Sequence, residues 1–309
     1  MPVLIVQFPH YAKEHLTDNN GASYVQFKND FIRSGYLPWN DGIHRRKFFN
    51  INGSYVDGSN QLHENEKVFF WGEWEAPSSF TSNFPAKPYP PFIHHLLHAH
   101  DPGSYINNSN VIVPNMPPGF THASKSGLQN TDPYVFGKHF IYSNCKQKGK
   151  LKVLAPGSVI LFGSSVDKKF VLDTVFVVSD SINYTLDKEE SFFDGLIADG
   201  WISRTFYNVT IKALQQDPAI ANHNNLLTLY KGATYGKPVD RMYSFFPCSN
   251  KARFNRPELT GLGINPKLTR GTKYIKILSK KAWTEVVRQV SKQNLMLGVF
   301  AEEPPVQIP

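Results

Sequence analysis

The chain has 309 residues, of which 41% are hydrophobic, 19% charged and 14% aromatic. This composition is globular, and a chain of this length buries enough apolar surface to fold without a disulfide or a structural metal. It excludes a disordered chain, a coiled coil, a collagen-like rod and a disulfide scaffold. The formal net charge of +8 leaves polyanionic partners open.

The first half of the chain contains several recognisable patterns. Residues 3–8 form an apolar run typical of a strand, and residues 24–33 have the apolar spacing of a helix. Asn52-Gly53 lies between two strand-like runs, which predicts a hairpin turn at that dipeptide. Residues 67–75 predict an aromatic-rich strand. Residues 76–135 are rich in Pro, Asn, Ser and His, and we expect this long segment to cover a site or a sheet face.

The second half is dominated by strand-like runs. Strands are predicted at residues 140–142, 158–162, 170–178, 226–230 and 242–246, and short helices at 192–197 and 209–216. Because no regular crossover helices separate the strands, we predict an α+β fold with a mixed or mainly antiparallel sheet, or a partly closed β-barrel, and peripheral helices. We expect an N-terminal part, residues 1–135, and a β-rich part, residues 136–309, as two domains or as one continuous domain.

The excess positive charge is concentrated in residues 251–309, which contain 11 Lys and Arg but only 4 Asp and Glu. Within this segment, residues 272–278 predict a strand and residues 280–294 a helix whose apolar stripe includes Trp283. Three basic residues fall on another face of that helix: Lys281, Arg288 and Lys292. This pattern predicts a nucleic-acid-binding surface, with a solvated helix as the alternative.

Residues 154–178 resemble part of a known group of folds. Leu154-Ala155-Pro156-Gly157 leads into the strand 158–162, a polar loop follows, and residues 170–178 form a second apolar strand. This arrangement resembles the core of PUA-like β-barrels, such as the ASCH, EVE and YTH groups. The resemblance implies binding of RNA or of a modified base, and enzymatic activity for some ASCH-like members. Ser158 stands where the family pattern has Asp, and the match is too short to assign a base-contacting residue.

The aromatic-rich strand combines two Trp with two Glu. Alternation along a strand places Trp71, Glu73 and Glu75 on one face and Trp74 on the other. Two carboxylates about 7 Å apart beside an indole could act as an acid–base pair, bind a cation or contact a stacked base. Glu73 and Glu75 are therefore candidate catalytic residues, and Trp71 and Trp74 candidate ligand-binding residues. A half-buried strand with an acidic edge is the alternative.

A second candidate is the histidine-rich run that follows a Pro-rich stretch. In a helix, His94 and His98 lie one turn apart on the same face, which is the spacing of zinc ligands. The alternative is ordinary hydrogen bonding within a short helix. The sequence leaves the identity of any cofactor unknown.

A third candidate lies between residues 229 and 248, where glycines, cations and aromatic rings are interleaved. The candidate ligand-binding residues are Tyr230, Lys231, Tyr235, Arg241 and Tyr243. Aromatic rings with nearby positive charge suit a base and its phosphate. A hairpin that joins two core strands is the alternative.

These features favour recognition of a nucleic acid or a nucleotide, with a modified base among the candidate ligands. One alternative is a hydrolase or transferase on a nucleotide-like substrate with Glu73 and Glu75 as the acid–base pair, and another is a structural or protein-interaction subunit. No stretch approaches the roughly 20 apolar residues that span a bilayer, so we expect no membrane partner. Two cysteines and no secretion-signal pattern favour a cytoplasmic location. The oligomeric state stays open.

Overall fold

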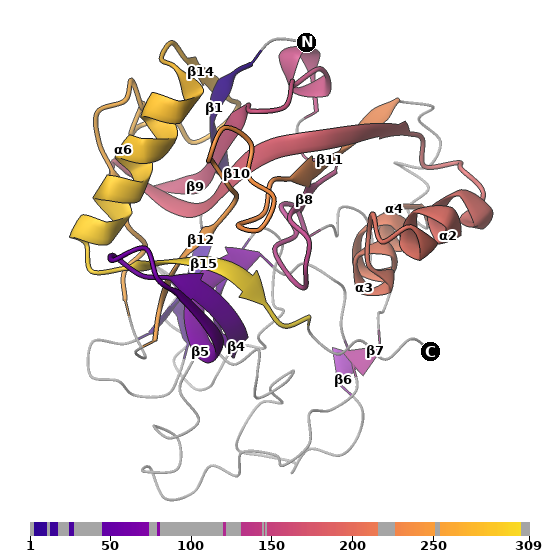
Figure 1. Cartoon of the computed structure of the whole chain (residues 1–309), viewed down its shortest axis with the longest axis horizontal. Helices are drawn as coiled ribbons and strands as arrows, with labels where there is room; N and C mark the ends of the chain where they lie inside the picture. Colours follow the sequence, from indigo (N-terminus) through magenta and orange to yellow (C-terminus); the bar gives the residue numbers. More distant parts are fainter. Residues whose placement is uncertain are drawn as a thin grey trace, which may run out of the picture.

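Figure 1 shows a computed structural model of the chain. The structure describes residues 3–10, 13–17, 25–27, 45–73, 79–80, 120–121, 131–143, 145, 147–215, 226–250 and 254–303. The described part contains two large β-sheets, here called sheet A and sheet B, and a two-stranded pair formed by β6 (Ser79–Phe80) and β7 (Phe120–Thr121).

Sheet A has seven strands. Its order is β14 (Lys273–Ile275), β1 (Ile5–His10), β9 (Val159–Val166), β10 (Lys169–Tyr184), β11 (Leu227–Gly232) and β8 (Ile141–Tyr142), with β13 (Glu258–Leu259) pairing β10. The β1–β9 pair is parallel and the other pairs are antiparallel. An apolar N-terminal run therefore lies between β14 and β9 in a sheet that the second half of the chain mostly builds.

Sheet B has six strands. Its order is β15 (Met296–Ala301), β12 (Phe246–Ser249), β5 (Leu62–Glu73), β4 (Arg45–Val56), β2 (Lys13–Thr17) and β3 (Val25–Phe27). β15 pairs with β4 as well as with β12, so four of these strands close into a small antiparallel barrel. The predicted α+β class with a mixed sheet and a partly closed barrel is confirmed.

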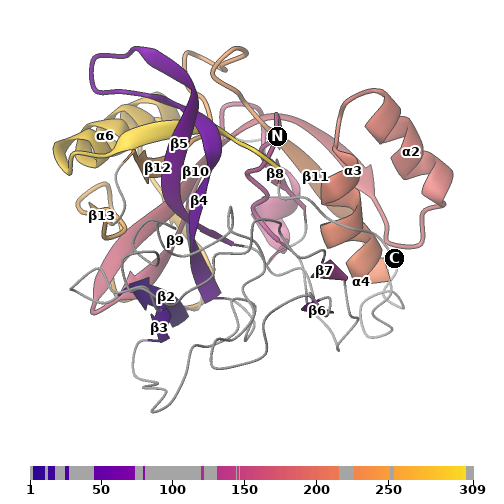
Figure 2. The same cartoon turned by 90° about the horizontal axis from the view of Figure 1, so that it is seen from below.

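The helical segments lie on two sides of the sheets (Figures 1 and 2). They are the 3-10 turn η2 (Gly149–Lys152), α2 (Glu190–Ala198), α3 (Arg204–Phe206), the π-helical η3 (Tyr207–Lys212), α4 (Ala213–Gln215) and α6 (Ser279–Lys292). In Figure 1, α6 lies at one side of the molecule and α2 to α4 at the other. The apolar stripe predicted for α6 packs on sheet A, because Val286 and Val290 share a core with Leu161 and Val175.

Aromatic side chains from both sheets fill the main core. Phe8 of β1 packs on Phe162 of β9 with ring centroids 4.8 Å apart. In the barrel, Phe70 of β5 lies 4.8 Å from Phe49 of β4 and 4.2 Å from Phe246 of β12, again between centroids. All five rings are fully buried, and they belong to one continuous cluster that joins the two sheets.

Two local predictions in the first half are wrong. Val25–Phe27, expected to be helical, forms strand β3 on the edge of sheet B, where pairing with β2 overrides the local helical spacing. The hairpin expected at Asn52-Gly53 also lies elsewhere, because β4 continues to Val56 and the chain turns at residues 57–61. In that turn, Asp57 Oδ1 accepts from the backbone N–H groups of Ser59 and Gln61, both at 2.9 Å.

Gly53 has a packing role instead of a turn role. A Cβ atom at this position would lie 2.3 Å from the carbonyl oxygen of Phe300 and 2.6 Å from Val68 Cγ2. Only a residue without a side chain lets β15 approach β4 this closely, so Gly53 permits the barrel to close.

We predict that Gly53→Ala destabilises the protein by about 1–3 kcal/mol, because the added methyl meets backbone that has no freedom to move aside. Gly58→Ala is the matched control, since Gly58 lies in the β4–β5 turn with nothing within 4 Å of its added Cβ. Urea unfolding of the two variants measures the difference. Equal unfolding midpoints would contradict the close approach of β15.

Candidate functional site

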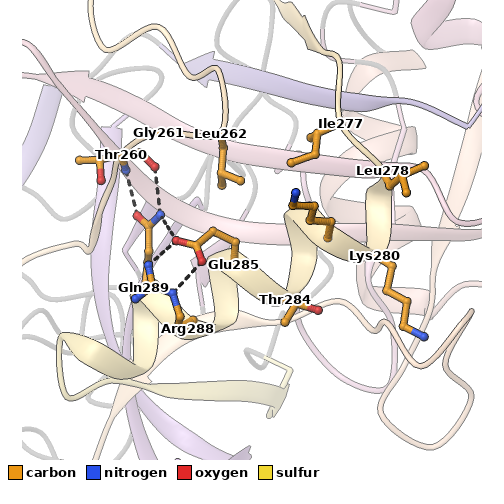
Figure 3. Close-up of a pocket in the computed structure, with 11 residues that line it drawn as sticks. Thr260, Gly261, Leu262, Ile277, Leu278, Lys280, Thr284, Glu285, Arg288 and Gln289 are labelled. Atoms are coloured by element: carbon orange, nitrogen blue, oxygen red, sulfur yellow. Dashed lines mark hydrogen bonds and ion pairs between the residues drawn. The ribbon is translucent and has the colours of Figure 1, made fainter.

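A groove runs along α6 between the helix, residues 260–262 and residues 277–278, with a volume of about 760 Å³. Leu262, Ile277 and Leu278 provide its apolar surface, while Lys280, Lys281 and Arg288 provide positive charge. Leu278 is 78% exposed. Figure 3 shows Leu278 and Lys280 at one end of the groove and Arg288 at the other.

Hydrogen bonds fix α6 relative to the opposite wall of the groove. Gln289 exchanges two bonds with the backbone of Thr260, accepting from its N–H and donating to its carbonyl, both at 2.9 Å. Gln293 bonds Glu258 in the same way at 3.0 Å. On the other side of the helix, Trp283 Nε1 donates to the Tyr243 carbonyl at 2.9 Å. These contacts make the groove a preformed feature.

The surface around α6 carries positive charge with little compensation. Residues 260–292 contain eight Lys and Arg and a single acid, Glu285. Seven of the eight cations are exposed and Lys273 is half-buried. Glu285 is already engaged: it accepts from Arg288 Nε at 2.6 Å and from Gln289 Nε2 at 2.9 Å. The Arg288 guanidinium lowers the pKa of Glu285 to about 2, so this carboxylate stays ionised.

Two of the three predicted nucleic-acid-binding residues line this groove, namely Lys281 and Arg288. Lys292 is exposed at the last turn of α6. Lys281 and Lys292 form no ion pair with the described carboxylates. Both ammonium groups are therefore available to an anionic partner.

The structure separates the five residues predicted between 229 and 248. Tyr230 is fully buried, and its hydroxyl donates to the Leu151 carbonyl at 2.9 Å and accepts from the Leu154 N–H at 3.0 Å. Lys231 points to the opposite face of β11, toward Trp201. Alternation along the strand sends these two side chains apart, so they do not share one site.

Tyr235 and Tyr243 of that set lie near α6. The rings of Tyr235 and Tyr243 meet edge to face at 5.2 Å, and Tyr243 also contacts Trp283 at 5.1 Å. Burial raises the pKa of Tyr243 to about 12. Arg241 is exposed in the turn between β11 and β12. Tyr243 thus anchors α6, and its ring is already occupied by the helix.

The face predicted on β5 is buried where the barrel meets sheet A. Trp71 is 5% and Glu73 3% exposed. Trp71 Nε1 donates to the Phe254 carbonyl at 3.1 Å, and Glu73 Oε2 lies 3.0 Å from His10 Nδ1. Trp74 and Glu75 lie outside the described residues, so their relation to Glu73 stays a prediction.

The predicted metal ligands His94 and His98 also lie outside the described residues. Within the described part of the chain, no group of three or more His, Cys, Asp or Glu side chains is placed to hold a metal ion.

Sequence reasoning missed a second buried polar group close to His10. The register of the β1–β9 pair places His10 opposite Ser164. Arg256 Nη1 lies 2.9 Å from Ser164 Oγ and 2.5 Å from Asp173 Oδ1. Asp173 occupies a β-bulge in β10, between Leu172 and Thr174. Ser164, Asp173 and Arg256 are all under 9% exposed.

No short motif could have revealed this group, because Arg256 lies more than 80 residues from Ser164 and Asp173 in the sequence. A polar residue inside or at the end of an apolar strand could have indicated a buried polar group. Asp173 within Phe170–Val178 is such a residue. Burial lowers the pKa of Arg256 to about 9, and the guanidinium still carries its charge at neutral pH. Arg256 thereby holds the segment before β13 against sheet A.

The described structure contains no helix long and apolar enough to cross a membrane.

A scan against protein-family models and searches of curated proteins and solved structures return no significant match. The PUA-like resemblance therefore stays an expectation that rests on residues 154–178. In the structure these residues build the β9–β10 hairpin of sheet A, whereas the closed barrel consists of β4, β5, β12 and β15.

We predict that Arg256→Met destabilises the protein by about 3–5 kcal/mol, because it removes the guanidinium that pairs with the buried Asp173 carboxylate. Lys169→Met is the control, since it breaks the exposed ion pair to Glu258, which is 2.8 Å long. Thermal and urea unfolding should show little change for the control. A small effect of Arg256→Met would show that water or another group replaces the guanidinium.

Proposed function

We propose that this protein binds nucleic acid through the groove along α6. The observation that supports the proposal is the set of seven exposed cations between residues 260 and 292, with one carboxylate that Arg288 already neutralises. Such a surface attracts phosphates and gains free energy from the release of counterions. The exposed cations repel one another in the free protein, and this repulsion is offset only when an anion binds.

The extent of the surface favours a polymer over a single nucleotide. α6 has 14 residues and is therefore about 21 Å long. Lys281, Arg288 and Lys292 are spread along it, which matches a run of phosphates better than one phosphate group. The apolar groove surface offers contact to sugars and bases. Because Tyr243 and Trp283 pack on each other, we expect contacts to the backbone to dominate over stacking on these rings.

The double variant Lys281→Gln/Lys292→Gln tests this proposal. We expect it to bind fluorescein-labelled RNA or DNA about tenfold more weakly at low salt, and to reduce the slope of log K against log salt by up to about 2. Fluorescence anisotropy between low and moderate salt gives both quantities for single- and double-stranded probes.

Lys148→Gln/Lys188→Gln is the matched control, because both lysines are exposed and neither lies on α6. It removes the same charge from other faces of the molecule. Equal weakening by the two double variants would indicate nonspecific attraction only. A wild-type protein that binds none of the probes at low salt would contradict the proposal.

A second candidate function is hydrolysis or group transfer on a nucleotide-like substrate. The buried contact between Glu73 and His10 Nδ1 supports it, because a carboxylate that orients an imidazole is a common acid–base arrangement. In a hydrolysis, His10 would accept a proton from the attacking water and return it to the leaving oxygen. Ser164 lies opposite His10 in the β1–β9 pair, and Arg256 donates a hydrogen bond to Ser164.

Glu73→Gln tests the second candidate, because an amide oxygen still accepts a hydrogen bond from His10 but carries no charge. We expect turnover of radiolabelled RNA, DNA or nucleoside triphosphate to fall about 10²-fold with the fold unchanged by circular dichroism. Glu66→Gln, at an exposed position of the same strand, is the control. Absence of turnover of all three substrates by the wild-type protein would rule this candidate out.

A further inference from the structure

A second polar cluster lies away from α6, where β8, β11, the α2–α3 turn and the end of β15 meet. Figure 2 shows β15 crossing the molecule from α6 toward β8 and α3, and Figure 1 agrees. Four side chains form what we call the Lys231 cluster: His139, Trp201, Lys231 and Glu303. None of them belongs to the α6 groove.

Lys231 is a half-buried cation that forms no ion pair within the described part of the chain, although strand pairing places Asp180 of β10 opposite it. Its Nζ lies 5.1 Å from the centroid of the Trp201 ring and 3.4 Å from the Gly200 carbonyl oxygen. It forms no ion pair with any described carboxylate. Burial lowers the pKa of Lys231, and Asp180, which lies opposite Lys231 across the β10–β11 pair, acts in the opposite sense. The ammonium group has thus lost part of its hydration, and its direct contacts are a weak carbonyl contact and a ring face.

His139 lies beside Lys231. β11 pairs Lys231 with Ile141 of β8, and the same register continues through the hydrogen bond from Gly232 N–H to the Phe140 carbonyl at 2.7 Å. His139 therefore lies diagonally across from Lys231 on one face of the sheet. Its Nδ1 atom is buried and has no hydrogen-bond partner among the described residues. Buried polar atoms are normally bonded to protein, to water or to a ligand, so this atom is open to a bound group.

The charge around His139 favours an anionic partner. Burial, and next the Lys231 charge, lower the pKa of His139, so the imidazole is neutral at neutral pH. A neutral imidazole with its proton on Nδ1 is a hydrogen-bond donor. Lys138 adds positive charge, while the Glu303 carboxylate acts in the opposite sense.

Glu303 is held in place by other contacts. The Tyr134 hydroxyl donates to Glu303 Oε1 at 2.9 Å. The same carboxylate packs on Gly137, where an added Cβ would lie 2.8 Å from Oε1. These contacts explain why Glu303 forms no ion pair with Lys231. The cluster therefore contains two donors, Lys231 Nζ and His139 Nδ1, and neither bonds a described carboxylate.

We propose that Lys231 and His139 form a binding site for a phosphate-type oxyanion, with the Trp201 ring as one wall. The anion would accept from both donors and would neutralise the half-buried ammonium. A free phosphate ion and the phosphate of a mononucleotide share this chemistry. This site is separate from the α6 groove, so the proposal does not depend on the nucleic-acid function.

Titration with inorganic phosphate at constant ionic strength tests the proposal. We expect saturable shifts of the His139 ring nitrogen and Lys231 side-chain resonances in NMR spectra, and a rise in the melting temperature of the wild-type protein. Lys231→Met should weaken phosphate binding at least tenfold. Without phosphate, this variant should be as stable as the wild type or more so, because it removes a desolvated charge.

Lys148→Met is the matched control, since Lys148 is exposed just before η2 and is not among the groups that shift the pKa of Lys231 or His139. It should bind phosphate like the wild type. Adenosine 5′-monophosphate and adenosine are the two further probes: tighter binding of the nucleotide than of phosphate identifies a nucleotide site, and equal binding identifies a simple phosphate site.

No saturable shift with phosphate or with the nucleotide, or equal binding by the wild type and Lys231→Met, would overturn the proposal. His139→Gln gives a second test that leaves Lys231 intact, and it should also weaken binding. The Lys281→Gln/Lys292→Gln variant should retain phosphate binding at this site. Failure of the α6 proposal and failure of this one are therefore distinguishable.

Discussion

The close approach of β15 to β4 is the constraint on which both candidate surfaces depend. β15 pairs with β12 on one side and β4 on the other, and this double pairing closes the barrel. It requires glycine at two positions, because a Cβ at Gly53 would meet the Phe300 carbonyl and one at Gly298 would lie 2.0 Å from Phe246 Cε2. The strand cannot move outward without breaking one of its two ladders.

The two ends of β15 carry this constraint to opposite sides of the molecule. α6 ends at Lys292, four residues before β15 begins, so the barrel fixes one end of the groove-forming helix. Glu303 follows the other end of the strand by two residues and packs on Gly137 beside His139. One strand therefore sets the position of the basic groove and of the Lys231 cluster, although the two surfaces share no side chain.

Patterns that depend on near neighbours in the sequence predicted the structure best. The apolar stripe with Trp283 predicted α6 and its buried face, and the long apolar runs predicted β9 and β10. The hairpin prediction at Asn52-Gly53 was wrong because glycine suits a tight turn and a close backbone contact equally well. Only the position of β15 shows that Gly53 has the second role. Strand pairing over more than a hundred residues is invisible to local pattern.

The same limit applies to the candidate sites. Tyr230 and Lys231 are neighbours in sequence, yet alternation on β11 sends one into the core and the other toward Trp201. Conversely, His10 and Glu73 come together only because β1 enters sheet A beside β9 while β5 belongs to the barrel. Composition indicated that aromatic and charged groups were abundant, but only the topology decides which of them meet.

The distribution of charge gives the strongest physical reason to assign a function to the α6 surface. Residues 1–250 are nearly neutral, with 22 Lys and Arg against 21 Asp and Glu, so the fold does not need a large positive charge. A helix that only covers sheet A would be equally soluble with mixed signs, and alternating charges along it would stabilise it through pairs one turn apart. Here Glu285 is the single acid on α6 and pairs with Arg288, while Arg288 and Lys292 carry like charges one turn apart. Repulsion among these cations brings no benefit to the fold. It is expected on a surface that binds a polyanion, because the polyanion neutralises the cations.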